Sequence, residues 1–92
     1  MTNHQTELAA QLKLGDESAF RQLVDEYEDM VYNTALGIVQ NEDDADDVTQ
    51  DVFVQVYQSI GGFRGESKLS TWLYKITVTK SLDLEKKKKR KK

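Results

Sequence analysis

Aromatic, basic and hydroxyl side chains are interleaved in one short segment toward the C-terminal end of the chain. The segment runs from Phe63 to Lys75 and reads FRGESKLSTWLYK. Aromatic rings stack on unpaired bases, Arg and Lys attract phosphates, and hydroxyls reach base edges or phosphate oxygens. These residue types together favour the binding of a single-stranded nucleic acid.

Helical spacing divides this segment and its continuation into two faces. Trp72 shares three- and four-residue steps with Leu69 and Ile76, which favours a place in the core over a stacking role. Phe63 and Tyr74 are the freer candidates for stacking on bases. The other face, which can follow a phosphate backbone, contains Lys68, Thr71, Lys75 and Thr79.

A second polar face lies on the preceding predicted helix. Three- and four-residue steps place acids, amides and one exposed aliphatic residue together. Acidic side chains around an apolar anchor suit the docking of a basic partner, because they provide both electrostatic steering and buried area. An ordinary solvated face is the alternative. The residues of this face are Asp47, Gln50, Asp51, Val54 and Gln58.

Catalysis and metal binding lack their usual residues. The acidic run over residues 42–51 has no histidine, cysteine or serine–base arrangement beside it. An EF-hand loop starting at Asp43 would need glycine and glutamate where this chain has Val48 and Val54. The chain has no cysteine, and its single histidine, His4, lies in a polar segment that favours solvent exposure. We therefore expect no enzyme activity, metal or cofactor.

Charge divides the chain into two parts. Residues 1–62 hold thirteen acids and two bases, whereas residues 63–92 hold eleven bases and three acids. Formal charges of −11 and +8 therefore lie behind the net charge of −3. We expect the basic part to bind a polyanion and the acidic part to bind a different partner. No leader-like start or membrane-length apolar run occurs, which predicts a soluble intracellular chain without membrane insertion.

Helices are the elements that must position both faces. The chain has no proline, and four of its five glycines mark the edges of periodic segments. Asp16 and Asn41 are suitable N-caps for the second and third helices. We expect one all-α domain over residues 1–92, a compact bundle of three to four helices. The predicted elements are helices over residues 5–14, 16–40, 42–60 and 68–90 and a loop over 61–67.

The third helix is predicted against a competing strand signal. Its run VFVQVY over residues 52–57 is rich in β-branched and aromatic residues, but an acidic cap and an apolar stripe of more than four turns favour a helix. The apolar row expected to face the core is Ala45, Val48, Val52, Phe53, Val56, Tyr57 and Ile60.

Three motifs occur in order along the chain. They are GDESAF at residues 15–20, DADDVTQDVF at 44–53 and FRGESKLSTWLYKI at 63–76. Together they resemble domain 2 of bacterial extracytoplasmic-function (ECF) sigma factors, over roughly residues 5–90. The resemblance implies an all-helical unit that joins core RNA polymerase and recognises the promoter −10 element as its non-template strand opens.

The resemblance also implies roles for the two faces. The face of the third helix would bind the clamp helices of the polymerase β′ subunit, and the loop over 61–68 would accept a base flipped from the −10 element. It further implies a bacterial cytoplasmic location and an anti-sigma factor as a possible partner. The DNA-binding residues expected on this basis are Phe63, Arg64, Ser67, Lys68, Thr71, Tyr74, Lys75, Thr79 and Lys86.

Two features depart from the family pattern. Many members have Asn in an Ile-Ala-x-Asn segment of the last helix, where this chain reads ITVT at residues 76–79. The hydroxyl of Thr79 lacks the paired donor and acceptor of an amide, so the base preference there is open. The family's domain 4, which reads the −35 element, is absent from the 92 residues, so we expect either an isolated domain or a truncated chain.

Alternatives remain for the whole chain and for its basic end. The run KKKKRKK over residues 86–92 either extends the DNA-contacting helix or is a flexible solubilising tail. The main rival function is a small acidic adaptor that binds a basic protein and uses the lysine tail only for solubility. Sequence-indifferent binding of single strands is a third possibility.

Overall fold

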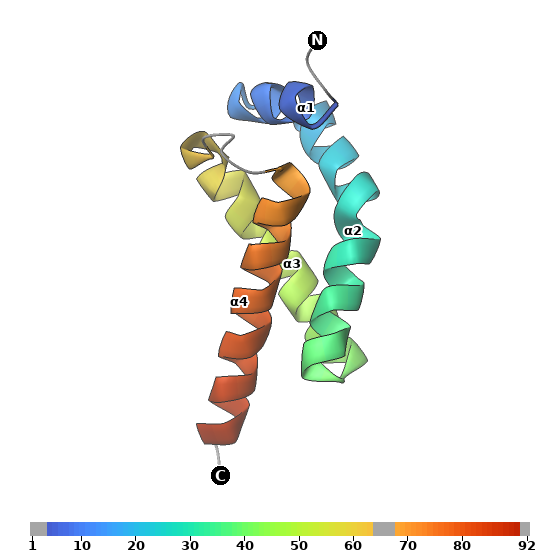
Figure 1. Ribbon diagram of the computed structural model, residues 1–92, viewed down its shortest axis with the longest axis vertical. Helices are drawn as coiled ribbons and strands as arrows, with labels where there is room; N and C mark the ends of the chain where they lie inside the picture. Colours follow the sequence, from blue (N-terminus) through green and yellow to red (C-terminus); the bar gives the residue numbers. More distant parts are fainter. Residues whose placement is uncertain (1–3, 64–67, 91–92) are drawn as a thin grey trace.

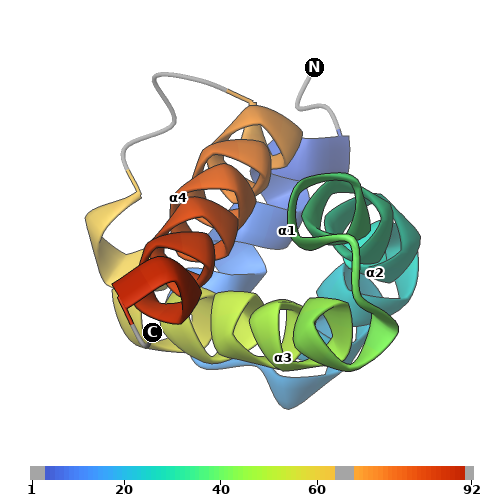
Figure 2. The ribbon, with the colours of Figure 1, turned by 90° about the horizontal axis from the view of Figure 1, so that it is seen from below.

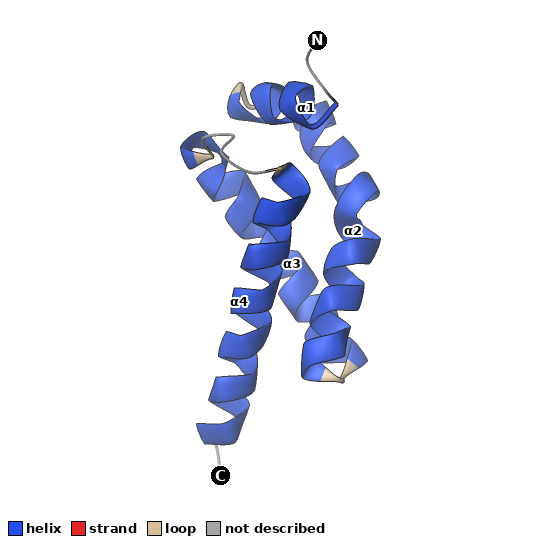
Figure 3. Cartoon of the chain, in the orientation of Figure 1, coloured by secondary structure: helices blue, strands red, loops and turns tan. Residues whose placement is uncertain are grey.

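The computed structural model of the protein describes residues 4–63 and 68–90, and these are helical apart from short connections. No strand occurs in these two ranges, and the all-α fold is confirmed (Figure 3). Each α-helix begins and ends within one residue of its predicted range. The elements are α1 (His4–Lys13), α2 (Glu17–Val39), α3 (Glu42–Ser59), the 3-10 helix η1 (Ile60–Gly62) and α4 (Leu69–Arg90).

Three long helices form an elongated bundle. Successive helices α2, α3 and α4 run in opposite directions, and α1 lies across the end of the bundle where α2 begins (Figure 1). Each of the three long helices contacts the other two, as the view along the bundle shows (Figure 2). The molecule measures 51 × 21 × 20 Å. This arrangement places the start of α3 beside the end of α4.

Side-chain caps fix the starts of α2 and α3. Asp16 Oδ1 accepts hydrogen bonds from the backbone N–H groups of Ser18, at 2.9 Å, and Ala19, at 3.3 Å. Asn41 Oδ1 accepts one from the N–H of Asp44 at 3.0 Å. Both predicted caps are therefore confirmed, and each satisfies backbone donors that the first turn of a helix leaves unpaired.

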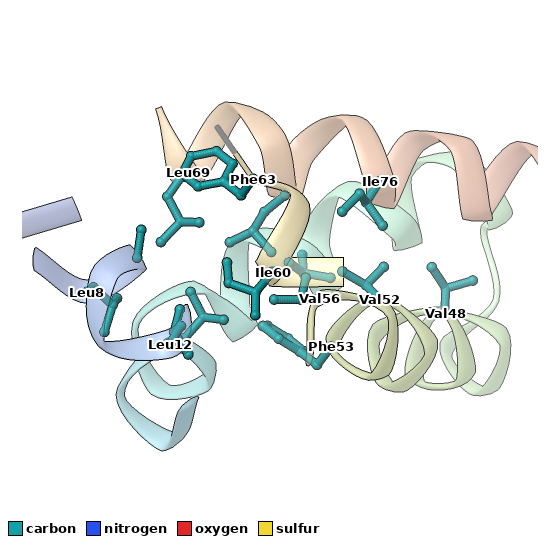
Figure 4. Close-up of a cluster of buried hydrophobic side chains, with 14 of the residues drawn as sticks. Leu8, Leu12, Val48, Val52, Phe53, Val56, Ile60, Phe63, Leu69 and Ile76 are labelled. Carbon is teal, nitrogen blue, oxygen red and sulfur yellow. The ribbon is translucent and has the colours of Figure 1, made fainter. Parts of the chain in front are cut away.

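A continuous aliphatic and aromatic core joins all four α-helices (Figure 4). The apolar face of α1 buries Leu8 and Leu12 against the end of the bundle. Two polar residues of α4, Thr77 and Ser81, are also fully buried. Their hydroxyls donate to the carbonyl oxygens of Leu73 and Thr77, one turn earlier, each at 2.7 Å. These bonds remove the cost of burying an unpaired hydroxyl.

Tyr57 is the exception in the predicted core row of α3. The other six members of that row are buried, whereas the side chain of Tyr57 is 63% exposed. It follows the fully buried Val56, and successive residues lie about 100° apart around a helix. Tyr57 therefore lies past the edge of the buried stripe, and the prediction that it belongs to the core was wrong.

The expected loop over residues 61–67 begins with structure of its own. The 3-10 helix η1 covers its first two residues, and the N–H of Phe63 donates to the carbonyl oxygen of Ile60 at 3.1 Å. In the described ranges, no helix is both long and apolar enough to cross a lipid bilayer.

Candidate nucleic-acid and protein-binding surfaces

The outer side of α4 presents the predicted phosphate-following residues. The side chains of Lys68, Thr71, Lys75 and Thr79 are exposed, and we call this set the α4 face. The intervening Leu69 and Leu73 are buried, so the two faces separate as their spacing predicts. Tyr74, beside the α4 face, is 52% exposed and keeps a ring surface open to solvent.

Phe63 differs from its expected role. Its side chain is only 8% exposed, and the centroid of its ring lies 5.0 Å from that of Trp72. Lys13 Nζ, from α1, lies 6.0 Å from the centroid of the same ring. Because these neighbours and the core cover the ring, Phe63 anchors the end of η1 and is not free to stack on a base.

Trp72 packs against the hydrophobic core while remaining partly exposed, which agrees with the core role favoured by its spacing. The two remaining loop candidates, Arg64 and Ser67, lie outside the described residues.

The predicted docking residues of α3 lie on the side of the helix away from its buried stripe. Asp47, Gln50, Asp51, Val54 and Gln58 are all exposed, and we call this set the α3 face. Val54, its aliphatic member, is 54% exposed. The structure therefore places an apolar side chain among acids and amides, the arrangement that the sequence predicted.

Tyr57 enlarges this apolar centre. It follows Val54 by three residues on α3, and its ring makes an edge-on contact with that of Phe20 on α2, with 5.4 Å between centroids. Sequence reasoning missed this contribution because it assigned the aromatic ring to the core. The position one residue after Val56 was the signal that could have placed Tyr57 outside the core.

A groove between α3 and α4 brings residues of both candidate sets together. It encloses about 530 Å³. Three members of the α3 face line it, and so does Lys86, which the sequence assigned to DNA. The full lining is Asp47, Val48, Gln50, Asp51, Lys80, Asp83, Leu84, Lys86 and Lys87.

An ion pair closes one end of the α3–α4 contact. Lys88 Nζ donates a hydrogen bond to Asp44 Oδ2, joining the last turns of α4 to the first turn of α3. This hydrogen bond raises the pKa of the Lys88 ammonium, and the negative charges of Asp44 and Glu85 act in the same direction. The basic run is therefore helical and attached to the bundle as far as Lys88.

The acidic start of α3 acts on other groups as well. Partial burial, followed by the carboxylates of Glu42 and Asp46, raises the pKa of the Tyr32 hydroxyl on α2. Within residues 4–63 and 68–90, the carboxylates do not gather into a group that could hold a metal ion. Their arrangement instead produces a negative surface, which attracts cationic groups.

We expect Asp44→Asn to lower the pKa of Lys88 toward the ordinary lysine value of 10.5, because it removes the charged acceptor. The pair's contribution to stability is complete below that ordinary value and is lost as the pH rises through the raised pKa of the folded protein. NMR titration of the Lys88 side chain measures the shift. Asp43→Asn removes a neighbouring charge and is the control; equal Lys88 pKa values in the native protein and Asp44→Asn would contradict the pair.

Comparison with known families gives a match over most of the chain. Residues 23–91 match the family model of sigma-70 region 2. The chain is 38% identical over 79 residues to the ECF RNA polymerase sigma factor SigW of Bacillus subtilis (strain 168), covering 86% of this chain and 42% of that protein. It is 37% identical over 71 residues to the ECF RNA polymerase sigma-E factor of Escherichia coli (strain K12), covering 77% and 37%. The chain thus spans less than half the length of these relatives.

A solved structure shares both the fold and part of the sequence. It is the NMR structure of an engineered region 2 of sigmaE in complex with GTAAAA. The TM-score is 0.85 at 30% sequence identity, and the match covers 98% of this chain and 96% of the other. The similarity therefore extends over the whole bundle, including both helices that carry the candidate faces.

Proposed function

The chain belongs to the sigma-70 region 2 family, as a domain of the ECF sigma factors, and from this we propose that it joins core RNA polymerase and recognises the −10 element of a promoter. The observation that carries the proposal is the α4 face, an exposed row of cations and hydroxyls on a bundle that resembles a region 2 solved in complex with GTAAAA. No catalytic step is required. We place the protein in the bacterial cytoplasm, with its DNA and polymerase.

The α4 face would hold the non-template strand. Lys68 and Lys75 lie seven residues, or about two helical turns, apart on one side of the helix, so both ammonium groups can contact phosphates of one strand. Thr71 and Thr79 add hydroxyls between and beyond them, and the exposed ring of Tyr74 offers a stacking surface. Lys86 extends the same side of α4 toward the groove.

A flipped base would be received near the start of α4. Extracting a base costs a few kcal/mol of stacking and pairing, which a preformed pocket can offset. The packed rings of Phe63 and Trp72 support this proposal by fixing one wall beside the segment expected to accept the base. In this role Phe63 acts as a structural support, and the base-contacting groups come from elsewhere.

The α3 face would bind the clamp helices of the polymerase β′ subunit. Its acids favour a basic surface, and Val54 with Tyr57 supplies exposed apolar area at its centre. The family resemblance also implies an anti-sigma factor as a partner. Such a protein would block DNA binding or polymerase binding by covering the α4 face or the α3 face.

Oligonucleotide binding tests the DNA role. We expect the hexamer GTAAAA to bind more tightly than a scrambled hexamer of the same composition, measured by fluorescence anisotropy at low salt. Lys68→Ala with Lys75→Ala should weaken binding and reduce the slope of log affinity against log salt by about 1.4, the value for two lost phosphate contacts on a single strand. Arg21→Ala, an exposed change on α2, is the control for charge alone.

Each result of these binding measurements favours a different one of the three possible functions. Absence of binding at low salt would contradict the DNA role and favour an acidic adaptor. Equal binding of both hexamers would favour sequence-indifferent binding of single strands. An unchanged salt slope in the double variant would mean that the two lysines do not contact phosphate.

A further inference from the structure

The junction between α1 and α2 is built by the start of the GDESAF motif, which neither proposed face uses. The N–H of Gly15 donates to the carbonyl oxygen of Leu12 at 3.0 Å, and that of Asp16 donates to the carbonyl oxygen of Gln11 at 3.2 Å. Gly15 has a φ of 80°, a left-handed conformation that glycine adopts at little cost. The two bonds form a Schellman motif, which ends α1 at a defined point. The last residue of α1, Lys13, therefore has a fixed backbone position.

The side chain of Lys13 reaches from this junction to the end of η1. Its Nζ lies 6.0 Å from the ring centroid of Phe63, within the range of a cation–π contact. Leu12, one residue earlier, is buried in the core and holds this end of α1 against the bundle. The ring of Phe63 packs in turn on Trp72 of α4, and we call these two rings the aromatic wall. Lys13 thus connects α1 to the aromatic wall.

The charge of Lys13 is unusual for its part of the chain. Residues 1–62 contain thirteen acids, and Lys13 and Arg21 are the two bases among them. A lysine in the last turn of a helix complements the helix dipole, and Lys13 occupies that position in α1. The dipole effect needs no aromatic neighbour, whereas a cation–π contact depends on the ring of Phe63. Substitutions at both positions can therefore tell the two roles apart.

We propose that Lys13 is a positioning residue for base recognition, which acts through the ring of Phe63 to hold the aromatic wall in place. The wall lies beside the segment expected to accept a flipped base. A preformed wall offsets more of the cost of extracting a base than a wall that becomes ordered only on binding. The part of this inference that concerns DNA rests on the proposed function; the part that concerns the contact between Lys13 and the wall does not.

Trp72 is the only tryptophan of the chain, so its fluorescence reports on the aromatic wall in the absence of DNA. We expect Lys13→Gln, which removes the charge but keeps most of the aliphatic stem, to shift the emission to longer wavelength and to increase quenching by acrylamide. Lys13→Arg should preserve both values, because a guanidinium also interacts with an aromatic face. Arg21→Gln removes a charge from an exposed site on α2 and is the control. Emission that the two glutamine variants change equally, or not at all, would overturn the contact.

A double-mutant cycle tests the role of Lys13 in base recognition. We expect Lys13→Gln to lower the ratio of affinities for GTAAAA and its scrambled hexamer about threefold, the loss typical of one cation–π contact. Phe63→Leu removes the ring and keeps an apolar side chain. In that background Lys13→Gln should change the ratio less than about 1.5-fold, because no ring is left to hold. An equal effect in both backgrounds would mean that Lys13 acts only on its helix end, and would overturn the positioning role.

Circular dichroism checks that the helices are intact in every variant. Should Phe63→Leu lose helicity, the affinity ratio of Lys13→Arg decides instead: a ratio close to that of the native protein supports the cation–π contact, and a ratio as low as that of Lys13→Gln contradicts it.

Salt dependence separates a positioning role from direct contact with DNA. Lys13→Gln should leave the slope of log affinity for GTAAAA against log salt unchanged, whereas a lost phosphate contact would reduce it by about 0.7. A reduced slope would therefore overturn the positioning role. If neither hexamer binds at low salt, the proposed function fails, and the fluorescence of Trp72 still decides whether Lys13 holds the wall. If the hexamers bind with a ratio that Lys13→Gln does not change, the inference fails and the proposed function stands.

Discussion

Leu73→Ala should lower the free energy of unfolding by about 3 kcal/mol. Leu73 is fully buried in the core. Truncation removes its transfer free energy and leaves a cavity that the three long helices cannot fully close. A domain of this size has a total stability of about 5–15 kcal/mol, so the loss is a large fraction of it.

Thermal and urea unfolding measure this effect. A melting temperature lower by roughly 15 °C is expected for a domain of fewer than 100 residues. Leu82→Ala is the matched control, because it makes the same chemical change on the same helix at a side chain that is 46% exposed. It should cost less than about 1 kcal/mol. Equal losses in the two variants would mean that the described burial of Leu73 is wrong.

Local sequence signals predicted the helices because the interactions that start and stop them are local. The side chain of Asp16 reaches backbone donors two and three residues ahead, and that of Asn41 reaches one three residues ahead. The acidic first turn also correctly favoured a helix, and not a strand, for the β-branched run at residues 52–57. Each of these choices depends on neighbours within one turn, so a single sequence contains the information needed.

The two misplaced aromatic residues show where local information ends. Spacing assigns a residue to one side of its own helix, but burial also depends on which neighbouring element crosses that side. Tyr57 lies at the edge of the buried stripe of α3 and is left exposed, with its ring in edge-on contact with that of Phe20. Phe63 has no helical neighbours to predict its burial, and its ring is covered by Trp72 and by Lys13 from α1.

The groove could not be predicted from charge patterning for the same reason. The division between residues 1–62 and 63–92 suggested two separate partners, one for each sign of charge. Because α3 and α4 are antiparallel, the end of the basic part returns to the start of the acidic helix, as the Asp44–Lys88 pair shows. Charge separation along a sequence therefore does not imply charge separation on the folded surface.

Asp51→Arg should weaken binding of the polymerase β′ clamp segment about thirtyfold, the loss typical of a charge that sits at the centre of an interface. The substitution removes an acid next to the apolar centre formed by Val54 and Tyr57 and places a cation against a basic partner. Pull-down or fluorescence titration with the clamp segment measures the change. Asp29→Arg reverses an exposed charge on α2 and is the control; equal weakening by both variants would indicate a diffuse effect of net charge and contradict docking at the α3 face.

The same substitution has a second expected effect of opposite sign. An arginine at position 51 adds a cation to a groove that lysines also line, so binding of a single strand such as oligothymidylate should strengthen while binding of the clamp segment weakens. Partial unfolding would weaken both, because each face depends on the bundle. Opposite changes in the two affinities would therefore separate a lost docking contact from a lost fold, and would do so in a single variant. Weakening of both affinities with helicity retained would contradict this prediction, because an added cation should favour a polyanion.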